Sequence, residues 1–570
     1  MSTLDRVTES FLRDIIFIAT AAFFGGFLAR SVKLPPVLGY ISSGILFSLI
    51  GRPFLSSYDG LLALSQLGIS LLLFTHGFEI TIDALKKIDK RILVVGVLQV
   101  IITSFVLFPI LTYVGLSIPV AILFSILFSF SSTTIVIKIL EEKSMLYNFP
   151  GNAIFLLLLV QDLFVVPVIV LFPILFGEAT GSFPSVLGSL VISAIKPVVI
   201  FLLILIFNKY FLSRVLGIIF RYPSHELTIL ATIFTAAITI ALLKYAGLPD
   251  AIAAFLAGVI ISEQGRNLAP LSEIRPLRDI FLVIFFVLTG MLFSVPYFIA
   301  HFWMIIFLTC IVLIIKFIVV YCLLRIQFFN LSPSLKISSY IINVGEFAIV
   351  IGQLALLDHH ISNDSYYLLL SVFVLSLAFI PFESSIIEKI HTKINKYKFL
   401  KKFFPDTHGA VVHSEQKIIN HVIICGHGRV GRNIRTVLDV AEIPYVVIDY
   451  NRKAILDIQN VGKHALFGDP TDPDILELAH IKSAKALVIT FSDVSENKKI
   501  IKVAKHLHKS IYIISRIYKK EDESEFLKLG ADEVTFPESE AGVRLGLKLL
   551  GNFHVSKEKQ DEYIKRIQDI

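Results

Sequence analysis

One carboxylate lies near the middle of an apolar segment, where it could hold a cation or a proton. Residues 156–170, LLLLVQDLFVVPVIV, are apolar except for Gln161 and Asp162. A charged residue at the centre of a membrane-spanning helix costs about 2.5–3.5 kcal/mol on insertion scales, which is tolerated where it faces a partner or a watery cavity. We therefore interpret Asp162 as an intramembrane ion or proton site; the alternative is a carboxylate neutralised in a structural hydrogen bond. Pro167 is expected to kink this helix.

Two polar interruptions in other apolar segments could complete such a site. Residues 129–134, SFSSTT, can hydrogen-bond freed backbone groups and so support a broken helix. In residues 343–347, NVGEF, Gly345 weakens the helix and Glu346 adds a second intramembrane carboxylate. One broken helix in each half suggests inverted repeats that cross at the midplane. The alternative for SFSSTT is hydrogen bonding between intact helices. The neutral oxygens of the predicted site belong to Gln161, Ser131, Ser132, Thr133 and Thr134.

Two basic side chains also lie within apolar segments. Lys316, in IVLIIKFIVVYC, is predicted to be the counter-charge of Asp162 or Glu346, since its mid-span position disfavours snorkelling to an interface. His76, in LLLFTHGFE, could sense pH, because histidine changes charge near physiological pH. We expect instead a structural histidine whose hydrogen bonds are satisfied.

The composition divides the chain into two domains. Of its 570 residues 55% are hydrophobic and 17% charged, against about 25% charged in soluble domains. Apolar runs follow one another from Phe11 to about Ile387, and the rest reads as soluble. We expect a polytopic α-helical membrane protein followed by a cytosolic α/β Rossmann-like domain. The predicted parts are a transmembrane domain (1–386), a basic linker (387–418), a nucleotide-binding domain (419–540) and a C-terminal helical tail (541–570).

Charge and cysteine content exclude other classes. The net charge of +7 is modest and comes mainly from short loops and the linker, so nucleic-acid binding is not expected. The three cysteines have neither disulfide nor metal-ligand spacing. Acidic residues precede the first apolar run, where a cleavable signal peptide would carry basic ones, so none is expected. These acidic residues are Asp5, Glu9 and Asp14.

About thirteen segments have membrane-spanning length. They are 11–30, 34–51, 61–80, 91–115, 117–140, 151–176, 185–208, 225–246, 248–263, 277–294, 298–324, 332–357 and 364–386. Basic residues gather in one set of alternate loops, which the positive-inside rule places in the cytoplasm. An odd number of spans then puts the C-terminal domain in the cytoplasm. The basic stretch 389–402 is predicted to lie on an anionic cytoplasmic leaflet; a solvated linker is the alternative.

A glycine-rich motif follows the first apolar run of the soluble domain. Residues 421–425, HVIIC, precede GHGRVG, in which three glycines form G-x-G-x-x-G between a strand and a helix. The second strand, YVVID, ends at Asp449, at the distance expected of an acid that binds ribose hydroxyls. Glycines there permit a tight turn and the close approach of a diphosphate to the helix N-terminus. The predicted nucleotide-binding residues are Gly426, His427, Gly428, Arg429, Val430, Gly431, Asp449, Tyr450, Asp469 and Arg516.

Further strand-like runs alternate with helical patterns and predict about six strands in one Rossmann-like domain. Asp469 belongs to the segment 468–472, GDPTD, which follows the third strand. Ligands bind at the carboxyl edge of such sheets, so this segment is expected to lie near the nucleotide. The remaining predicted strands are 465–467, 486–491, 511–515 and 533–536.

Together these motifs resemble a known family. The membrane part resembles monovalent cation:proton antiporters of the Kef branch, the glutathione-regulated potassium efflux systems, over most of residues 11–386. The soluble part, about 419–540, resembles the TrkA-N or RCK nucleotide-binding domain through VIICGHGRVG, VVID and GDPTDPDIL. The membrane motifs are LGISLLLFTHGFE (67–79), SFSSTTIVIKILEE (129–142), VQDLFVVP (160–167), AAFLAGVIISE (253–263), FFVLTGM (285–291) and NVGEFAIVI (343–351).

The resemblance implies thirteen spans, a homodimer in the bacterial inner membrane, and an ion site at Gln161-Asp162 between crossed broken helices. It also implies a cytosolic domain that gates transport and a basic residue, here Lys316, that can pair with the aspartate. Kef systems bind glutathione on the soluble domain, and Arg516 falls in a matching strand; a cytosolic ancillary subunit is a further implied partner. The chain departs from the family at Thr75-His76, where an aliphatic pair is usual.

We therefore expect a secondary active transporter and not an enzyme. Some antiporters of this kind carry two adjacent acids, whereas Gln161 precedes Asp162 here, as in Kef proteins. One carboxylate that exchanges one proton for one cation suggests electroneutral K⁺/H⁺ exchange, with sodium as an alternative. The nucleotide effector could be AMP, NAD(H) or ATP. A ligand-gated potassium channel is the rival class, but the sequence lacks a carbonyl filter of the Thr-Val-Gly-Tyr-Gly type. A membrane oxidoreductase would need acid–base, flavin or haem residues that are not found.

Overall fold

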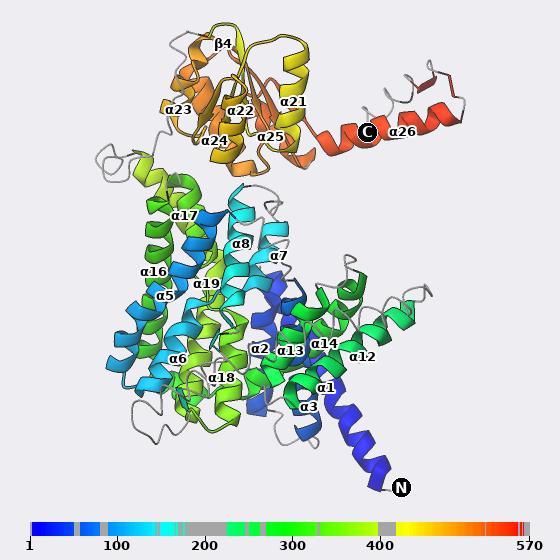
Figure 1. Cartoon of the computed structure of the whole chain (residues 1–570), viewed down its shortest axis with the longest axis vertical. Coiled ribbons are helices and arrows are strands. Elements are labelled where there is room, and N and C mark those ends of the chain that lie inside the picture. The colour runs from blue at the N-terminus through cyan, green and yellow to red at the C-terminus, as the bar shows by residue number, and fades with distance from the viewer. Residues whose placement is uncertain are drawn as a thin grey trace. The chain divides into compact units, whose positions relative to one another are not determined.

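The computed structural model describes residues 3–50, 58–79, 89–168, 175–176, 225–245, 250–262, 269–327, 331–396, 418–556, 559–560 and 563, with short gaps inside these ranges. The chain forms two compact units, one mainly of residues before 397 and one mainly of residues after it. Each unit is described by itself below (Figure 1). The predicted span 185–208 and most of the predicted linker lie outside the described residues.

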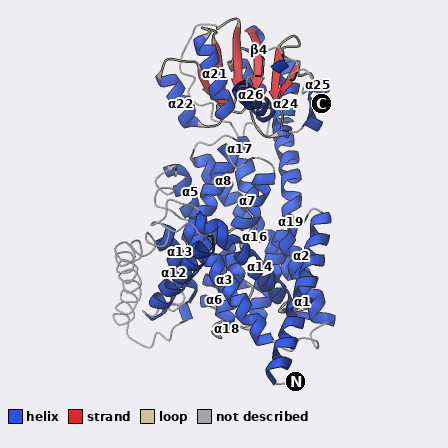
Figure 2. Ribbon diagram, turned by 90° about the vertical axis from the view of Figure 1, so that its right-hand side faces the viewer, coloured by secondary structure: helices blue, strands red, loops and turns tan. Residues whose placement is uncertain are grey.

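In the first unit, the described residues form helices and short connections (Figures 1 and 2). Its helices are apolar around most of their circumference, as expected of segments that are surrounded by lipid and by other helices. They are α1 (Thr3–Ser31), α2 (Pro36–Ile50), α3 (Tyr58–Glu79), α5 (Lys90–Tyr113), α6 (Ile118–Ser129), α7 (Thr133–Glu142), α8 (Phe149–Leu163), α12 (His225–Tyr245), α13 (Asp250–Ser262), α14 (Ala269–Met291), α15 (Val295–Ala300), α16 (Phe302–Ile326), α17 (Leu331–Tyr340), α18 (Glu346–Leu357) and α19 (Asn363–Lys396).

Five stretches in the described residues are long and apolar enough to cross a membrane. They are 12–31, 90–113, 118–142, 302–326 and 363–380. Shorter apolar helices account for several other predicted spans. The predicted short span 248–263 is the short helix α13. The total of thirteen spans stays a prediction.

Glycines set the distance between α3 and its neighbour α13. A Cβ atom added at Gly77 would lie 2.0 Å from the Phe255 carbonyl oxygen, and one added at Gly258 would lie 2.0 Å from the Phe74 carbonyl oxygen. No real side chain tolerates such contacts, so only glycine at both positions lets the two backbones approach this closely. This packing fixes the part of α3 that carries His76.

Both predicted helix breaks are present. The span 117–140 divides into α6 and α7, with Phe130 in extended conformation between them. The span 332–357 divides into α17 and α18, with the extended Gly345 as the N-cap of α18. The helix with the expected kink at Pro167 is interrupted: α8 ends at Leu163, and helical residues resume at Val165. Proline has no N–H to donate to the carbonyl four residues earlier, which is that of Leu163.

The second unit contains one six-stranded parallel sheet with the order β3-β2-β1-β4-β5-β6, flanked by helices (Figure 2). The strands confirm the six predicted runs to within two residues. They are β1 (His421–Cys425), β2 (Tyr445–Asp449), β3 (Ala465–Phe467), β4 (Ala484–Ile489), β5 (Tyr512–Arg516) and β6 (Glu533–Thr535). The main helices are α21 (Arg429–Val440), α22 (Arg452–Asn460), α23 (Pro473–Leu478), α24 (Val494–Leu507), α25 (Glu523–Leu529) and α26 (Pro537–Asn552).

Each face of this sheet has its own apolar core. Ile423 and Cys425 of β1 belong to the cluster on one face, and Ile424 between them belongs to the cluster on the other. Strand residues alternate between the two faces, so a buried strand of this kind needs consecutive apolar residues. The strand order reverses between β1 and β4, and ligands bind at such a reversal in open parallel sheets. The glycine-rich loop after β1 lies at this place.

Candidate ion site and nucleotide site

The two broken helices contact each other at their breaks. The Gly345 N–H donates to the Phe130 carbonyl (3.0 Å). The Ser131 hydroxyl donates to the Ile341 carbonyl (2.6 Å). A Cβ atom at Gly345 would lie 2.7 Å from the Ser131 carbonyl oxygen, so the glycine is required for this approach. Backbone groups that one break releases are therefore satisfied by the other, as a water-poor interior demands.

Asn343 joins the same crossing through its side chain. Its Oδ1 atom accepts a hydrogen bond from the Ser132 N–H (2.8 Å), and its Nδ2 atom donates to the Tyr340 carbonyl (3.2 Å). The amide thus replaces helix hydrogen bonds on both broken helices. The sequence motif NVGEF includes Asn343, but the predicted site omitted it because its partner is 211 residues away.

Lys316 lies on the C-terminal side of the crossing. Its Nζ atom donates to the carbonyls of Phe130 (2.8 Å) and Asn343 (2.5 Å) and to the Ser131 hydroxyl (3.0 Å). An ammonium has three hydrogens, and these three oxygens match them. Lys316 was predicted as the partner of a carboxylate, whereas these hydrogen bonds go to oxygens of the crossing. Its charge therefore compensates the partial negative charge where α6 and α17 end.

The Gln161 side chain hydrogen-bonds to the backbone at the break between α6 and α7. Its Oε1 atom accepts the Ser131 N–H (2.9 Å), and its Nε2 atom donates to Gln99 Oε1 (2.8 Å). Gln99 in turn donates to the Ser129 carbonyl (2.9 Å). The Gln161 oxygen thus accepts a hydrogen bond from a backbone donor freed at the break. An amide oxygen has two lone pairs, so its predicted role as a neutral oxygen for a cation stays a prediction. A polar Gln99 within an apolar helix was the signal that sequence reasoning missed.

Two carboxylates lie at the N-terminal ends of the other half-helices. Asp162, near the end of α8, accepts the Thr133 hydroxyl at 3.0 and 3.1 Å from its two oxygens. Thr133 is the first residue of α7. Glu346 is the first residue of α18, and its Oε1 atom accepts the Thr134 hydroxyl (2.8 Å). Helix N-termini carry partial positive charge, so the crossing favours anionic groups at these positions.

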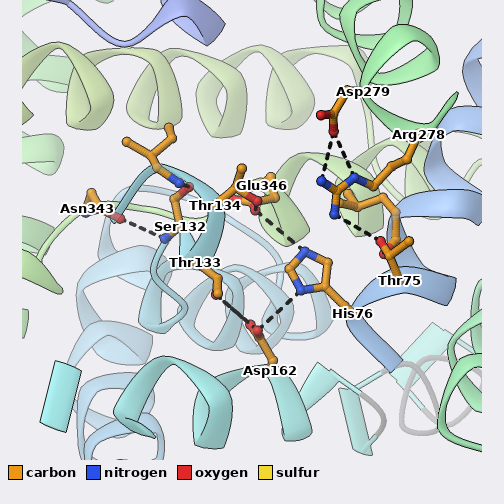
Figure 3. A network of polar contacts seen from close by, with 12 residues as sticks. Thr75, His76, Ser132, Thr133, Thr134, Asp162, Arg278, Asp279, Asn343 and Glu346 are labelled. Carbon is orange, nitrogen blue, oxygen red and sulfur yellow. Dashed lines mark hydrogen bonds and ion pairs between the residues drawn. The ribbon is translucent and has the colours of Figure 1, made fainter. Parts of the chain in front are cut away.

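His76 lies between the two carboxylates (Figure 3). Its Nδ1 atom is 3.5 Å from Asp162 Oδ2, and its Nε2 atom is 3.9 Å from Glu346 Oε1. The imidazole packs edge-on against the Phe347 ring at a centroid distance of 5.0 Å, which restricts the plane of the ring. The histidine that was expected to be structural thus contacts both ionisable groups of the predicted site. Its two partners are distant in sequence, so no local motif announced this.

A second polar group holds the same turn of α3. The Arg278 Nη1 atom donates to the Thr75 hydroxyl oxygen (3.2 Å), and the same guanidinium bonds Asp279 Oδ1 at 2.8 and 3.0 Å. Thr75 donates its own hydrogen to the Leu72 carbonyl (2.9 Å). Figure 3 shows this pair beside the His76 network. The family departure at Thr75-His76 thus places two polar side chains with different partners on one turn.

The residues predicted for the ion site therefore lie close together and form two groups. Asp162, Glu346, Thr133 and Thr134 form a group around His76. Most of the others build the crossing itself; these are Gln161, Ser131, Ser132 and Lys316. Nearly all of these side chains are buried, and Thr134 is exposed. The carboxylate group thus borders accessible space at Thr134, whereas the crossing is enclosed.

In the soluble unit, the glycine-rich loop connects β1 to α21. Gly426 has φ +101°, which an L side chain adopts only with strain, and a Cβ atom there would lie 2.6 Å from Thr490 Oγ1. A Cβ atom at Gly431 would lie 2.0 Å from the Gly426 carbonyl oxygen. At Gly428, no atom in the described part of the chain lies within 4 Å of the added Cβ. Packing therefore explains two of the glycines, and the middle one leaves room for a ligand at the helix N-terminus.

Asp449, at the end of β2, accepts a hydrogen bond from the backbone of this loop. Asp449 Oδ2 accepts the His427 N–H at 2.5 Å, and Oδ1 accepts the Asn451 N–H at 2.7 Å. Burial raises the pKa of Asp449, and these backbone donors act in the opposite direction. Burial lowers the pKa of the His427 imidazole to about 4, and Arg435 and Arg432 contribute in the same sense. His427 is therefore neutral at physiological pH.

Tyr450 and Asp469 form a buried network at the same edge of the sheet. The Tyr450 hydroxyl contacts Asp469 Oδ1 (2.9 Å) and Glu496 Oε1. Asp469 also accepts the Thr471 N–H (2.8 Å) and hydroxyl (2.7 Å), which fixes the segment after β3. Burial, followed by the two carboxylates, raises the pKa of Tyr450 well above its usual value. Sequence analysis missed Glu496, which lies on α24.

The other predicted nucleotide-site residues fall into two places. Arg429 and Val430 begin α21 beside Gly428, where the chain turns into the helix. Arg516 ends β5, donates to Glu538 Oε1 (2.5 Å), and stacks over the Tyr518 ring at 4.2 Å. All lie at or just after the carboxyl ends of parallel strands. This is the edge at which ligands bind in open parallel sheets, and a helix N-terminus of this kind favours anionic groups.

Comparisons with known proteins support both the membrane exchanger domain and the C-terminal Rossmann-like domain. Residues 18–384 match the family of the sodium/hydrogen exchanger, transmembrane, and residues 422–537 match the TrkA-N domain. The putative cation/proton antiporter YbaL of Escherichia coli K12 is 25% identical over 537 residues, which is 93% of this chain and 95% of YbaL.

Two solved structures are also similar. The sodium proton antiporter MjNhaP1 from Methanocaldococcus jannaschii has a TM-score of 0.50 at 16% identity, covering 66% of this chain and 97% of that one. The TrkA-N domain of ybaL from Escherichia coli is 31% identical, with a TM-score of 0.23, covering 24% of this chain and 99% of that one. The first of these shows a shared membrane fold.

The crossed broken helices, the buried carboxylates and the parallel sheet define a membrane cation/proton exchanger with a C-terminal Rossmann-like domain. The chain belongs to the sodium/hydrogen exchanger family and carries a TrkA-N domain at its C-terminal end. The predicted resemblance to Kef-type antiporters is confirmed at this level. The chain is thus an integral membrane protein of a transporter family.

Proposed function

We propose that this antiporter exchanges potassium for protons and that Asp162 binds both in turn. The observation that supports this most directly is the burial of Asp162 against the crossing, with only one threonine hydroxyl as its hydrogen-bond donor from α7. A carboxylate has about four lone-pair positions, so Asp162 retains acceptor capacity for a cation or a proton. Thr133 and Thr134 contribute neutral oxygens beside it.

Competition for one carboxylate couples the two fluxes. A protonated Asp162 has lost the charge that attracts a cation, and a bound cation lowers the proton affinity of Asp162 because the nearby positive charge favours the ionised carboxylate. Each crossing of the membrane therefore carries one or the other. The half-helix N-termini hold the carboxylate in its empty, ionised state between the two events. Lys316 acts from the opposite side of the crossing by compensating the helix C-termini.

Proteoliposomes test this proposal. Purified protein is reconstituted with an internal pH dye, a K⁺ gradient is imposed, and the membrane potential is clamped at zero. Proton movement that follows K⁺ and vanishes in Asp162→Asn is the expected result. Potassium flux without linked proton movement would identify a ligand-gated channel, and proton movement driven by Na⁺ alone would identify a sodium/proton antiporter.

We further propose that a nucleotide such as AMP, NAD(H) or ATP binds at the loop 426–431 and regulates exchange. The support is the G-x-G-x-x-G loop at the strand-order reversal, with ligand space at Gly428. We also propose that this domain lies in the cytoplasm and that the protein is a homodimer in the bacterial inner membrane. Titration of each nucleotide into purified protein, followed by thermal unfolding, should reveal a stabilising ligand. Loss of that shift in Gly428→Val, with exchange retained, would support a regulatory role; no shift with any nucleotide would overturn it.

A further inference from the structure

The space between the two buried carboxylates belongs to a side chain of this protein. The His76 ring has one nitrogen facing Asp162 at 3.5 Å and the other facing Glu346 at 3.9 Å (Figure 3). His76 is 4% exposed, Asp162 3% and Glu346 5%, so water does not separate the three groups freely. A cation that contacted the inner oxygens of both carboxylates would have to enter the volume that the ring occupies.

The ring is held in this place by its own surroundings. Phe347, next to Glu346, packs edge-on against it with an interplanar angle of 60°. The helix that carries it is locked against α13 through Gly77, its neighbour in sequence. Arg278 holds the preceding residue, Thr75. His76 therefore lies between the carboxylates because α3 is positioned there.

We propose that His76 is a specificity-determining residue that competes with the transported cation for Asp162 and Glu346. The ring and the cation use the same carboxylate oxygens, so binding of one displaces the other. This inference rests on the proposed function, in which Asp162 binds the cation. In this proposal the cation must displace the His76 ring before it binds, which costs free energy. An aliphatic residue at position 76 would not impose this cost.

The proposal predicts that replacing His76 changes the apparent KM for K⁺ without raising the maximal rate of exchange. Removing the ring frees the carboxylates, so the apparent KM for K⁺ should fall at a fixed pH. A contribution to Asp162 equal to that of one hydrogen bond to a charged group corresponds to a change of about tenfold. The maximal rate should not rise with it, because a more tightly held cation is released more slowly. A purely structural histidine would give unchanged KM with lower protein stability.

The test compares His76→Ala and His76→Gln with His301→Ala, which removes an exposed histidine outside the site. Exchange is measured in proteoliposomes at one pH across K⁺ concentrations, with choline maintaining ionic strength. The expected order of KM is Ala below Gln below wild type, with His301→Ala equal to wild type. A KM in both His76 variants equal to or above that of wild type would overturn the inference.

A binding measurement separates this inference from the function on which it rests. Thermal unfolding of the full chain in detergent is followed as K⁺ is titrated. If K⁺ stabilises wild type and not Asp162→Asn, while His76→Ala shifts to a lower half-maximal concentration, both proposals stand. An unchanged midpoint in His76→Ala and His76→Gln, with the Asp162→Asn effect intact, overturns only the competition. Equal K⁺ stabilisation of wild type and Asp162→Asn overturns the cation site itself.

Discussion

The ion site and the nucleotide site both lie where regular structure stops, yet they draw on the chain differently. At the ion site, the Thr134–Glu346 hydrogen bond joins residues 212 apart, and Ser132–Asn343 joins residues 211 apart. At the nucleotide site, the contact from His427 to Asp449 spans 22 residues. The first is an interior in which polar groups satisfy one another, and the second is an edge whose glycine leaves space for a ligand. The difference predicts which substitutions damage folding and which damage binding alone.

The largest effect is expected where one side chain satisfies several groups of the crossing. Lys316→Met leaves the carbonyls of Phe130 and Asn343 without this donor in a buried, apolar setting. The Phe130 carbonyl keeps the Gly345 N–H as a donor, whereas the buried Asn343 carbonyl loses Lys316 Nζ. One buried acceptor left unsatisfied costs about 1–3 kcal/mol, so the membrane unit should lose roughly that much stability. Thermal unfolding and yield of the detergent-solubilised chain measure this. A variant with wild-type Tm would contradict the view that Lys316 holds the crossing.

A pair of glycine substitutions separates folding from binding at the nucleotide edge. Gly431→Ala places a Cβ atom 2.0 Å from the Gly426 carbonyl, so it should destabilise the domain by about 1–3 kcal/mol. Gly428→Val adds bulk where no described atom lies within 4 Å of the Cβ, so stability should change by less than about 0.5 kcal/mol.

Unfolding and nucleotide titration are compared for the two glycine variants. Nucleotide binding should be lost in Gly428→Val although the domain remains folded. If instead Gly431→Ala were neutral and Gly428→Val unfolded the domain, the assignment of packing to one glycine and ligand space to the other would be wrong.

A smaller effect is expected from acid in the soluble unit. Burial lowers the pKa of His427 to about 4 and also lowers that of His421, against about 6.5 in an unfolded chain. Between these values the unfolded chain binds protons that the folded domain does not, so stability falls as pH falls from about 6.5 towards 4. Hydrogen exchange of β1 and α21 amides, corrected for intrinsic rates, should therefore accelerate over this range. His427→Asn should reduce the acceleration, and an equal response would contradict the assignment.

How much could be predicted from sequence follows from the same contrast. The soluble sheet and its glycine-rich loop were predicted well, because the strand, the turn and the acidic residue are close in sequence. Glycines at this spacing between a strand and a helix are typical of a tight turn with close backbone contacts. The broken helices were predicted because polar runs within apolar spans have a physical cost. The partners within the crossing were not, because a carbonyl acceptor such as that of Phe130 has no signature in the sequence. Lys316 was therefore predicted as the counter-charge of a carboxylate and Gln161 as a neutral oxygen for the cation, and their hydrogen bonds to the helix breaks were not foreseen.

His76 illustrates the limit most clearly. Its type permits either a structural or an ionic role, and only the placement of α3 between Asp162 and Glu346 decides between them. That placement depends on the approach of α3 to α13 through Gly77 and Gly258, which is a property of helix packing. A histidine next to a glycine in an apolar helix was the available signal, and it became informative once the facing carboxylates were in place.

The central claim is that a proton and a cation compete for Asp162, and direct proton release tests it. Potassium chloride is added to the purified full chain in weakly buffered detergent, and a pH dye reports protons in the medium; choline chloride is the control. We predict release that saturates with K⁺ concentration and is absent in Asp162→Asn. Release from Asp162→Asn equal to that from wild type, or no release from wild type that binds K⁺, would contradict the account.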